Sequence, residues 1–522
     1  MRVGVDVGGT NTDAVLMDGR EVLAEFKTPT TPDVTSGIAG ALRGLQQRQA
    51  FIPSEISGVM IGTTHFTNAV VEATRLQRTA VIRLGLPATA ALPPMIDWPA
   101  RLRDAVGVHA YLCHGGNEFD GREISALDPD EIRRAAEGIG EAGIDTVAIS
   151  AVFSPVNSEM EIRAAQLVRE VLPGAAISLS HEIGRVGLLE RENATILNGC
   201  LRRLADHISG ALQEAVHAAG ITAPLYISQN DGTLMSVEYC RQYPVATFAS
   251  GPTNSMRGAA FLSGQADCIV VDVGGTTTDI GALQRGFPRE ASVTVDVGGV
   301  RTNFRMPDVV SIGLGGGSLV NQSKSSLGIG PRSVGYEIGR RALVFGGESL
   351  TATDLAVAAG MCDIGDPELV QGLDPALVAT GVLLIRQKVE DVIDRVKTSA
   401  EPLPVVVVGG GSVLLPDRLA GASVVIKPDH FAVANAIGAA IGQVGGEVDR
   451  IVSLANMTRE EALKSARQEA IDKAVAAGAD GSTVEVVEVE EVPLAYLPSS
   501  AVRIRMKAVG DLRVEVSNSA AS

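Results

Sequence analysis

Short apolar, β-branched runs alternate along most of the chain with longer segments in which apolar residues recur at helical spacing. Runs of the first kind predict buried strands at residues 3–5, 59–62, 80–84, 146–152, 176–179, 225–228, 269–271 and 405–408. Segments of the second kind predict helices at residues 34–49, 129–142, 195–204 and 434–441. Strands that alternate with helices favour a mostly parallel sheet with helices on its faces, which is the α/β class.

Two of these strands run into almost the same eight residues. Residues 6–13 read Asp-Val-Gly-Gly-Thr-Asn-Thr-Asp, and residues 272–279 read Asp-Val-Gly-Gly-Thr-Thr-Thr-Asp. The two copies differ only at Asn11 and Thr277. Each copy follows a buried run, so each predicts a strand that turns tightly and returns. Two such elements indicate two halves built on one design.

The residues of the turn are suited to holding phosphate. Gly8 and Gly9 permit a sharp turn and place no β-carbon between the backbone N–H groups and an anion, and the hydroxyls of Thr10 and Thr12 add donors. A plain hairpin turn would explain one copy, but two copies after two buried strands favour a phosphate site. The predicted nucleotide contacts in the loops are Gly8, Gly9, Thr10, Asn11, Thr12, Asp13, Gly274, Gly275, Thr276 and Thr277.

The aspartates that flank the two turns would repel a bare phosphate. Asp6 and Asp272 occupy the same place in the two copies. A hard divalent cation between carboxylate and phosphate resolves the repulsion, and Mg²⁺ bound through waters is the usual choice. We therefore predict ATP with Mg²⁺ at this site, with Asp6 and Asp272 as the metal residues.

A third glycine loop follows the uninterrupted strand at residues 405–408. Gly409, Gly410 and Gly411 carry no side chains, so a base or ribose could lie flat against their backbone. These three glycines are the predicted adenosine site.

Polar clusters at other strand ends supply candidates for the substrate side, because ligands of open α/β sheets lie where strands run into helices. His65 and Asn68 follow the strand at 59–62, and Asn230 follows the strand at 225–228. Arg257 belongs to a small-residue helix that begins after Ser250. A hydrogen-bonded turn histidine remains the alternative for His65, and a simple helix N-cap remains the alternative for Ser250.

Three further stretches carry structural expectations. Residues 113–122 predict a polar loop, since the Cys, His and Asp spacing matches no common metal site. Residues 295–302 predict a hairpin in the same sheet as the second loop. In the crossover at residues 180–204, Arg191 and Asn193 are expected on a solvated helix face, with a functional role as the alternative.

The totals narrow the class of protein. A chain of 522 residues predicts two or three domains, and 45% apolar residues with 58 glycines are typical of an α/β enzyme. The net charge of −17 disfavours nucleic acid and anionic membranes as partners. We predict lobes at residues 1–198 and 199–446, followed by a small α+β appendage at 447–522 where the composition changes.

The location of the protein is predicted to be the cytoplasm. The first residues enter a strand without a charged and then apolar leader, and no apolar run approaches the roughly 18 residues of a membrane span. The five cysteines are scattered and form no Cys-x-x-Cys pair, which is typical of reduced thiols.

Taken together, the motifs resemble a known superfamily. The two Asp-x-Gly-Gly-Thr loops, the Val-Val-Gly-Gly-Gly loop and the helix Ala-Asn-Ala-Ile-Gly-Ala are similar, in that order, to the actin/Hsp70/sugar-kinase ATPases. Three stretches narrow the resemblance to the hydantoinase/oxoprolinase A-type family, namely residues 61–69, 250–252 and 311–318. The resemblance implies a two-lobed actin-like ATPase, with duplicated ribonuclease H-like domains and a small C-terminal appendage.

The resemblance also implies an activity, which is ATP-dependent opening of a cyclic amide or imide such as a hydantoin, 5-oxoproline or a lactam. It implies carbonyl phosphorylation, with His65, Asn68, Asn230 and Arg257 on the substrate side. The resemblance departs from the family pattern where Thr253 stands for the usual alanine and where Asn254, Ser255 and Asp231 stand for the usual glycines, so the substrate could differ. Relatives of this length commonly work with a separate B-type subunit, and a homo-oligomer is also open.

Two other functions stay open at this point. A small-molecule kinase of the same superfamily would use the same loops but would leave the phosphate on its product. A nucleotide switch without catalysis would hydrolyse ATP slowly and independently of substrate. The polar clusters at three strand ends favour an enzyme over a switch, because a switch needs only the nucleotide site.

Overall fold

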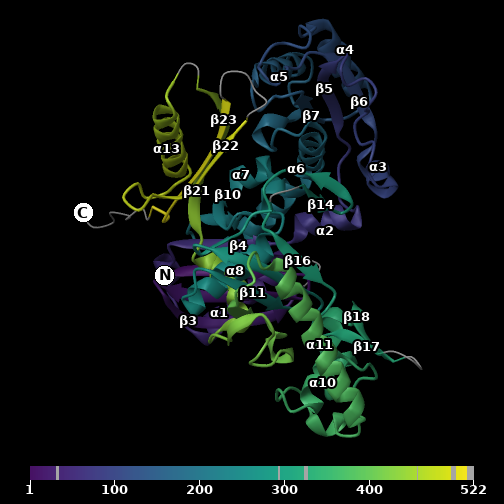
Figure 1. Cartoon of the computed structure of the whole chain (residues 1–522), viewed down its shortest axis with the longest axis vertical. Helices are drawn as coiled ribbons and strands as arrows, with labels where there is room; N and C mark the ends of the chain where they lie inside the picture. The colour runs from purple at the N-terminus through teal and green to yellow at the C-terminus, as the bar shows by residue number, and fades with distance from the viewer. Residues whose placement is uncertain (31–33, 292–293, 323–326, 455–456, 495–500, 514–522) are drawn as a thin grey trace.

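The computed structural model describes residues 1–30, 34–291, 294–322, 327–454, 457–494 and 501–513. Figure 1 shows three groups of elements along the long axis of the molecule. The strands around the first hairpin lie in the middle. A separate parallel sheet and the C-terminal strands of the first sheet lie above them, and helices α10 (Ala352–Ala358) and α11 (Pro375–Val396) lie below them.

The largest sheet has nine strands and contains the first glycine loop. In spatial order it runs β22 (Glu485–Pro493), β23 (Ala501–Gly510), β21 (Gln443–Ser453), β10 (Thr233–Ser236), β9 (Leu225–Ser228), β4 (Gly58–Thr63), β1 (Arg2–Val7), β2 (Asn11–Asp18) and β3 (Glu21–Pro29). Strand β1 pairs antiparallel with β2 and parallel with β4, and β4 pairs parallel with β9. The carboxyl ends of β1, β4 and β9 therefore meet at one edge.

The two faces of β1 are covered by different helices, as its alternating residues require. Val3 and Val5 are fully buried in a core with α1 (Val34–Arg48) and α6 (Leu188–Ala218). The other face carries Gly4, where a β-carbon would lie 2.1 Å from the carbonyl oxygen of Ala436 in α12 (Ala434–Ala440). Only glycine permits α12 to approach this closely.

A second sheet repeats the arrangement around the second loop. Its strands are β13 (Phe287–Pro288), β12 (Thr278–Gln284), β11 (Cys268–Val273), β19 (Leu403–Val408) and β20 (Ala422–Ile426), with β16 (Val309–Ile312) also paired to β12. Strand β11 pairs antiparallel with β12 and parallel with β19, as β1 does with β2 and β4. Helices α10 (Ala352–Ala358) and α11 (Pro375–Val396) share one core with this sheet. The predicted duplication is confirmed.

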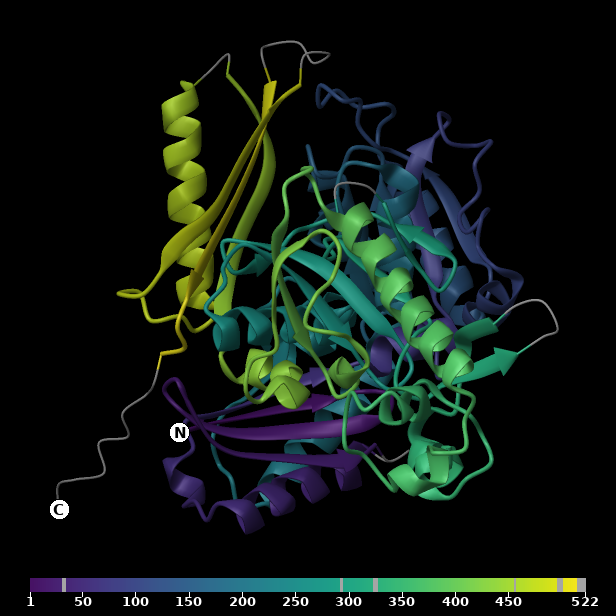
Figure 2. The same cartoon turned by 60° about the horizontal axis from the view of Figure 1, so that its bottom comes forward.

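Helices α8 (Ser250–Ser263) and α12 join the two sheets through glycines. A β-carbon on Gly258 would lie 1.9 Å from the carbonyl oxygen of Ala434, and one on Gly438 would lie 1.8 Å from that of Asn254. Helix α8 packs on the second sheet, where Met256 contacts the core of β11, while α12 packs on β1. This close helix contact holds the two sheets together (Figure 2).

A third sheet is entirely parallel and carries its own helices. Its order is β6 (His109–His114), β5 (Ala80–Leu86), β7 (Thr146–Ala151) and β8 (Ala176–Leu179). Helices α4 (Pro129–Glu141) and α5 (Glu159–Val171) share one apolar core with it. The prediction of a loop at 113–122 is wrong at its start, because Cys113 and His114 are the last residues of β6. This strand was missed because residues 109–112 contain too few apolar residues in a row to predict a strand.

Helix α6 is longer than predicted and lies between the first and third sheets. The expected solvated face is wrong, since Arg191 is fully buried and Asn193 is 3% exposed. Arg191 donates to the Oγ of Ser180 at 2.9 Å and to the carbonyl oxygen of Val186 at 2.7 Å. The charge is therefore held by hydrogen bonds in the interior.

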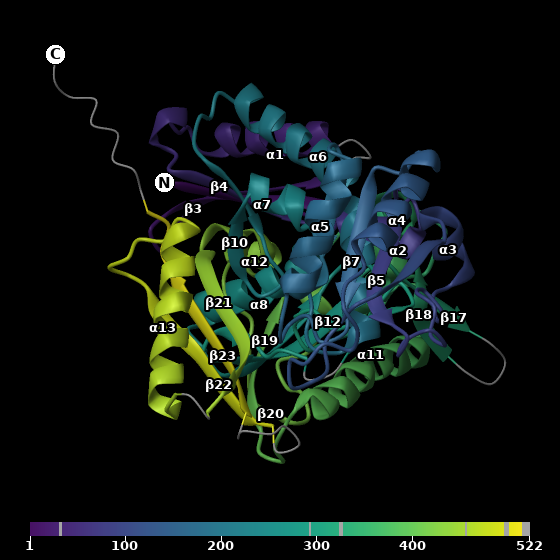
Figure 3. The same cartoon turned by 90° about the horizontal axis from the view of Figure 1, so that it is seen from above.

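The C-terminal segment belongs to the largest sheet. Strand β21 pairs with β10 and β23, and α13 (Arg459–Ala476) covers one face through buried alanines at every fourth position. Figure 3 shows this layer on one side of the molecule and β5 and β7 on the other. Strands β4 and β9 pair although they lie on opposite sides of the predicted boundary at residue 198, and β21 runs through the predicted boundary at residue 446. The domain division stays a prediction.

The predicted hairpin at 295–302 forms, but outside the sheet of the second loop. Strands β14 (Val295–Val297) and β15 (Val300–Thr302) pair only with each other among the described residues, because the segment packs against α6 and α2 instead. The remaining regular elements are α2 (His65–Glu72), α3 (Ala100–Val106), α7 (Val237–Gln242), α9 (Ile338–Arg341), β17 (Ser318–Gln322) and β18 (Leu327–Ser333). Within the described ranges, no helix is long and apolar enough to cross a membrane.

Candidate active site

The two glycine loops adopt the same turn. Gly8 N–H donates to the carbonyl oxygen of Asn11 at 3.0 Å, and Gly274 N–H donates to that of Thr277 at 2.9 Å. The loops also face one another, since a β-carbon on Gly275 would lie 3.5 Å from Cγ2 of Thr10. The structure thus brings the two predicted loops to one place, with backbone N–H groups from both halves.

Neighbouring segments brace each loop in a different way. The Oγ1 of Thr30 donates to the carbonyl oxygen of Gly8 at 2.8 Å. On the second loop, Gly316 N–H and Gly317 N–H donate to the carbonyl oxygens of Gly274 and Gly275 at 3.0 and 2.8 Å. The glycine loop at 313–318 is therefore a support for the second loop.

Asp6 is buried next to another carboxylate. It lies opposite Asp13 in the register of β1 and β2, and Nδ2 of Asn435 donates to its Oδ2 at 2.8 Å. Burial and the charge of Asp13 raise the pKa of Asp6 to about 7. Among the described residues, Oδ1 of Asp6 accepts no hydrogen bond of ordinary geometry, although the nearby side-chain amide of Asn254 partly offsets the rise in the pKa of Asp6. A buried acceptor without a donor is costly unless a ligand completes it.

The second half repeats the pair of aspartates. Asp272 lies opposite Asp279 in the register of β11 and β12. Burial raises the pKa of Asp272, and burial with the charge of Asp272 raises that of Asp279 to about 6 despite a hydrogen bond from Ser311. The charge of Asp272 also contributes to the raised pKa of Asp6, so the two halves share one electrostatic site.

This set of carboxylates fits a divalent cation held mainly through water. No three His, Cys, Asp or Glu side chains of the described residues lie close enough to form a direct metal cluster. A cation between the loops would nevertheless reduce the repulsion between the aspartates, and it would bind Oδ1 of Asp6. Asp6 and Asp272 are the residues that would hold it.

The third glycine loop lies directly against the second. Gly411 N–H donates to the carbonyl oxygen of Val273 at 2.7 Å, and a β-carbon on Gly409 would lie 2.2 Å from Oδ1 of Asp272. Gly409 has φ +84°, which favours glycine. A β-carbon on Gly410 would meet only Nζ of Lys27, at 3.9 Å. Gly410 thus leaves open space beside the second loop.

Lys27 and Asn435 are site residues that the sequence analysis missed. Lys27 Nζ lies 3.0 Å from Oδ1 of Asp13 and is the group that a β-carbon on Gly410 would meet, at 3.9 Å. Lys27 is opposite Asp13 in the pairing of β2 and β3, so aligning the return strand with the motif would have found it. No comparable signal marked Asn435, because its approach to Asp6 depends on how α12 packs.

His65 and Asn68 lie beside the first loop, at the end of β4 and on α2. Thr63 Oγ1 and His65 Nδ1 are 2.6 Å apart, as in the turn alternative. Burial and the charge of Arg75 lower the pKa of His65 to about 4, so the imidazole is neutral near pH 7. Asn68 follows His65 in α2 and is half-buried.

Asn230 and Arg257 have contacts of their own. Asn230 Nδ2 donates to the carbonyl oxygen of Arg305 at 2.5 Å. Arg257 donates to the carbonyl oxygen of Gly286 at 3.0 Å and stacks on the ring of Phe287 at 4.0 Å, and burial lowers its pKa to about 10. The contacts of Arg257 hold α8 on the segment at β13, and a substrate role for either residue stays a prediction.

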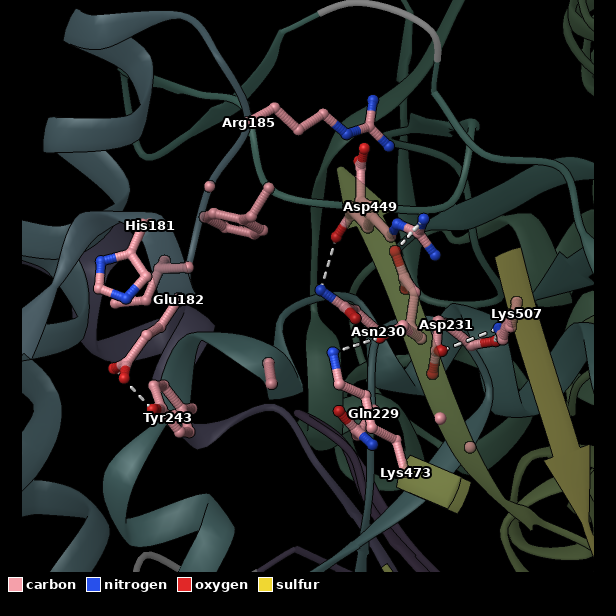
Figure 4. Close-up of a pocket in the computed structure, with 18 of the residues that line it drawn as sticks. His181, Glu182, Arg185, Gln229, Asn230, Asp231, Tyr243, Asp449, Lys473 and Lys507 are labelled. Carbon is pink, nitrogen blue, oxygen red and sulfur yellow. Dashed lines mark hydrogen bonds and ion pairs between the residues drawn. The ribbon is translucent and has the colours of Figure 1, made fainter. Parts of the chain in front are cut away.

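A cavity of about 950 Å³ opens further along the same sheet edge (Figure 4). Gln229 and Asn230 line it where β9 ends, two strands from β1, which corresponds to about 10 Å at the usual strand spacing. Its other walls come from residues 181–186 and from β21 and β23. Of this lining, the sequence analysis predicted only Asn230 as a site residue, because the walls at residues 181–186 and at β21 come from segments more than 250 residues apart along the chain.

The fold and the loops define a class of protein, the two-lobed actin-like proteins, in which duplicated halves bring two glycine loops face to face. The pattern of the hydantoinase/oxoprolinase N-terminal region matches residues 2–172, and that of the hydantoinase/oxoprolinase domain matches residues 191–366. The chain belongs to the hydantoinase/oxoprolinase family.

Curated relatives and solved structures agree with this assignment. The chain is 30% identical over 428 residues to the caprolactamase subunit alpha of Pseudomonas jessenii, which covers 77% of this chain and 59% of that protein. It is 26% identical over 421 residues to the acetophenone carboxylase gamma subunit of Aromatoleum aromaticum, covering 74% of this chain and 56% of that protein. The chain thus spans less than two thirds of the length of these relatives.

The same fold is present in two solved structures. The crystal structure of the ATP-dependent caprolactamase from Pseudomonas jessenii matches with a TM-score of 0.81 at 21% identity, covering 98% of this chain and 88% of that one. The nucleotide-free structure of acetone carboxylase matches with a TM-score of 0.68 at 16% identity, with the same coverage. The predicted actin-like fold class is confirmed.

Proposed function

We propose that this chain is the A-type subunit of an ATP-dependent hydrolase that opens a cyclic amide or imide of the hydantoin, 5-oxoproline or lactam type. Support comes from the family, from the caprolactamase relative, and from the two opposed glycine loops. The loops are the observation that carries the proposal, because they supply backbone donors from both halves to one anion.

The proposed chemistry makes a poor electrophile reactive. Transfer of the γ-phosphoryl group of ATP to the ring carbonyl oxygen releases ADP and makes the carbonyl carbon more electrophilic, so that water adds to it. The ring C–N bond then breaks as the nitrogen takes up a proton, and a second water hydrolyses the resulting acyl phosphate to the free acid and phosphate. Overall, one cyclic amide, one ATP and two waters give the ring-opened acid, ADP and phosphate. Phosphoryl transfer needs chiefly positioning and charge neutralisation.

The chain's own residues have distinct parts in this proposal. The N–H groups at the tips of the two glycine loops bind the phosphates, while those of Gly8 and Gly274 close the turns, and Gly409 to Gly411 bind the adenosine. Asp6 and Asp272 hold Mg²⁺, which when bound neutralises charge on the transferring group. Lys27 adds a fixed positive charge at the same place.

His65 is assigned to hydrogen bonding and not to proton abstraction. Its lowered pKa makes the imidazole a weak base. Thr63 engages Nδ1, and Nε2, which forms no hydrogen bond within the described part of the chain, would contact the substrate. Asn68 lies about one helical turn further along α2 and supplies an amide on the same side.

A partner subunit is part of the proposal. The caprolactamase and acetophenone carboxylase relatives are both named as subunits, so hydrolysis here would be completed with a B-type chain. The carboxylase relatives favour a second candidate function, in which the same loops activate a ketone carbonyl for carboxylation. The two candidates share the nucleotide chemistry and differ in the acceptor.

The test is ATP turnover by the full chain with Mg²⁺, alone and with its co-purified partner, against hydantoins, 5-oxoproline and lactams. Free phosphate and ring-opened product are followed together. Equal release of both supports the hydrolase. Phosphate release that depends on a ketone and bicarbonate would support the carboxylase. A stable phosphorylated product would support the kinase, and slow turnover that does not depend on a substrate would support the switch. Any of these three results would overturn the hydrolase.

A further inference from the structure

Two buried polar atoms lie close together beside the first glycine loop. One is the acceptor Oδ1 of Asp6, and the other is the donor Nδ2 of Asn254 in α8; both residues are 2% exposed. Within the described residues, neither atom has a hydrogen bond of ordinary geometry. A buried donor and a buried acceptor are costly when they stay unpaired, so each is the natural partner of the other.

Gly62 in β4 brings these two atoms together. It lies directly opposite Asp6 in the parallel pairing of β1 and β4. A β-carbon on Gly62 would lie 2.3 Å from Oδ1 of Asp6 and 2.5 Å from Nδ2 of Asn254. The missing side chain therefore leaves the space through which the amide approaches the carboxylate.

The other oxygen of Asp6 is held by a second carboxamide. Nδ2 of Asn435 donates to Oδ2 of Asp6 at 2.8 Å. Oδ1 of Asn435 accepts from the backbone N–H of Ala436 at 3.0 Å, which sets the amide with its nitrogen toward Asp6. The carboxylate thus lies between an amide from α8 and an amide from α12.

Two contacts are needed to fix the direction of this carboxylate. The terminal torsion of an aspartate side chain is broad, so the rotamer alone does not set where the two oxygens point. A donor on Oδ2 leaves the carboxylate free to turn about that contact, and a second donor on Oδ1 stops the rotation. Each oxygen has two lone pairs, so Oδ1 can accept from Asn254 and still face a metal ion or its water.

The two amides come from helices whose backbones are in contact. A β-carbon on Gly438 of α12 would lie 1.8 Å from the carbonyl oxygen of Asn254 itself. Helix α12 therefore packs on the residue that carries one of the amides. Because α8 packs on the second sheet and α12 on β1, the contact that joins the two halves also sets where Asn254 lies relative to Asp6.

The next residue of α8 contacts the corresponding carboxylate of the second half. Ser255 is 1% exposed. Burial raises the pKa of Asp272, and a hydrogen bond from Ser255 acts against that rise. Adjacent residues of one helix thus reach the two aspartates that would hold Mg²⁺.

We propose that Asn254 is a positioning residue, whose amide holds the carboxylate of Asp6 in the orientation that receives the metal. Since its amide nitrogen is buried, Asn254 acts through Asp6 and does not contact the nucleotide. This inference rests on the proposed function, which places Mg²⁺ at Asp6 and Asp272. A buried amide that served only the stability of the fold would leave metal binding unchanged.

The test measures binding of the Mn²⁺ complex of a non-hydrolysable ATP analogue to the full chain, by the change in its electron paramagnetic resonance spectrum. Asn254→Leu keeps the size and branching of the side chain but removes the donor. Asn254→Gly removes the side chain and introduces no clash. Both variants should raise the Kd of the Mn²⁺ complex about tenfold, and thermal unfolding shows that each is folded.

Asn198 is the control for the loss of a buried amide. It is fully buried in α6, and its Nδ2 donates to the Oγ of Ser178 at 3.0 Å and to the carbonyl oxygen of Gln242 at 2.9 Å. Asn198→Leu should bind the Mn²⁺ complex like the wild type. Equal losses in Asn198→Leu and Asn254→Leu would assign the effect to general damage and overturn the proposal.

A second arm separates the amide from the carboxylate without changing either residue. Gly62→Ala places a β-carbon against both atoms, so it should weaken binding of the Mn²⁺ complex at least as much as Asn254→Leu. Gly58→Ala, at the other end of β4, is the control. A β-carbon there would meet Cε of Met60 at 2.9 Å, which is the end of a flexible side chain, so the Kd should stay at the wild-type value.

A double-mutant cycle shows whether Asn254 acts through Asp6. In an Asp6→Asn background the glycine loops still bind the phosphates, so a Kd remains measurable. Adding Asn254→Leu to this background should cause no further loss. A further tenfold loss would show that Asn254 affects the metal by another route, and the proposal would be wrong.

The two proposals fail in different ways. If the wild-type chain binds the Mn²⁺ complex and either the Asn254 variants or Gly62→Ala bind it as tightly, Asn254 does not position the metal residue and the proposed function stands. If the wild-type chain does not bind the Mn²⁺ complex, the loops hold no metal and nucleotide. The proposed function is then wrong, and this inference falls with it.

Discussion

Lys27 lies directly opposite Asp13 on neighbouring strands, and its Nζ is 3.0 Å from Oδ1 of that carboxylate. The side chain is about one third exposed while Asp13 is buried. The charge of Lys27 also lowers the pKa of Asp272 in the other half of the molecule, against the effect of burial. One lysine thus stabilises carboxylates on both sides of the glycine loops.

Lys27→Met should therefore weaken binding of MgATP. Removing the cation leaves the acidic site without its fixed counter-charge, and we expect about a tenfold increase in Kd, which corresponds to about 1.4 kcal/mol. Isothermal titration with MgATP measures this. Lys427→Met is the control, because it removes an ion pair of the same length, with Asp417, outside the loops. An unchanged Kd for Lys27→Met would show that Lys27 acts only within the hairpin.

The pKa of Asp6 predicts how the stability of the nucleotide-free protein depends on pH. Its folded value, about 7, lies above the ordinary value of 3.8. Between these values the unfolded chain releases the proton and the folded chain keeps it, so stability should fall as the pH rises from about 4 to about 7. The loss should be on the order of a few kcal/mol.

Asp6→Asn should remove this part of the pH dependence and lower ATP turnover by about 100-fold, since the metal residue is lost. Urea unfolding at pH 5 and pH 8 checks the first expectation. Asp231→Asn is the control with the opposite sign: the pKa of Asp231 is lowered to about 2, so its contribution is lost as the pH falls below about 4. A variant Asp6→Asn with wild-type turnover would exclude Asp6 from the site.

Gly409 is expected to be intolerant of any side chain. A β-carbon there would lie 2.2 Å from Oδ1 of Asp272, and φ is +84°. Gly286 is the matched control, because its φ is +77° but no atom lies within 4 Å of a β-carbon. Both alanine variants should lose roughly 1 kcal/mol from backbone strain. Only Gly409→Ala should also lose measurable MgATP binding, and equal affinities of the two variants would contradict this account.

Much of the fold could be predicted because it depends on local signals. The paired loops at residues 6–13 and 272–279 follow from glycines and β-branched runs within ten residues of each other. The burial of Arg191 and Asn193 could not be predicted, because it arises where two sheets enclose α6. A charged helical residue is usually solvated, and only tertiary contacts override that expectation.

The candidate site divides in the same way. Asp6, Gly8 and Gly275 were found because a repeated motif carries them, and Lys27 was missed although strand pairing would have placed it beside Asp13. Of the cavity at residues 181–186, only Asn230 had a local signature, as a polar residue that follows a strand. The cavity exists because β21 and β23 from the end of the chain add to a sheet that begins at residue 2, which places them opposite residues 181–186.

The contact between α8 and α12 provides the last prediction. A β-carbon on Gly438 would lie 1.8 Å from the carbonyl oxygen of Asn254, and backbone cannot yield as a flexible side chain can. Gly438→Ala should push α12 from α8 and so separate the two sheets that carry the glycine loops. We expect a loss of about 3 kcal/mol of stability, in the range of overpacked cores, and a larger loss of ATP turnover than the unfolded fraction explains.

Gly40→Ala is the control for that variant. Gly40 lies in α1 and no atom lies within 4 Å of a β-carbon there, so alanine should stabilise the helix by roughly 0.5–1 kcal/mol. Thermal unfolding and ATP turnover of the two variants are compared below their melting temperatures. If Gly438→Ala loses stability but keeps full turnover per folded molecule, the helix contact holds the fold without setting the distance between the loops.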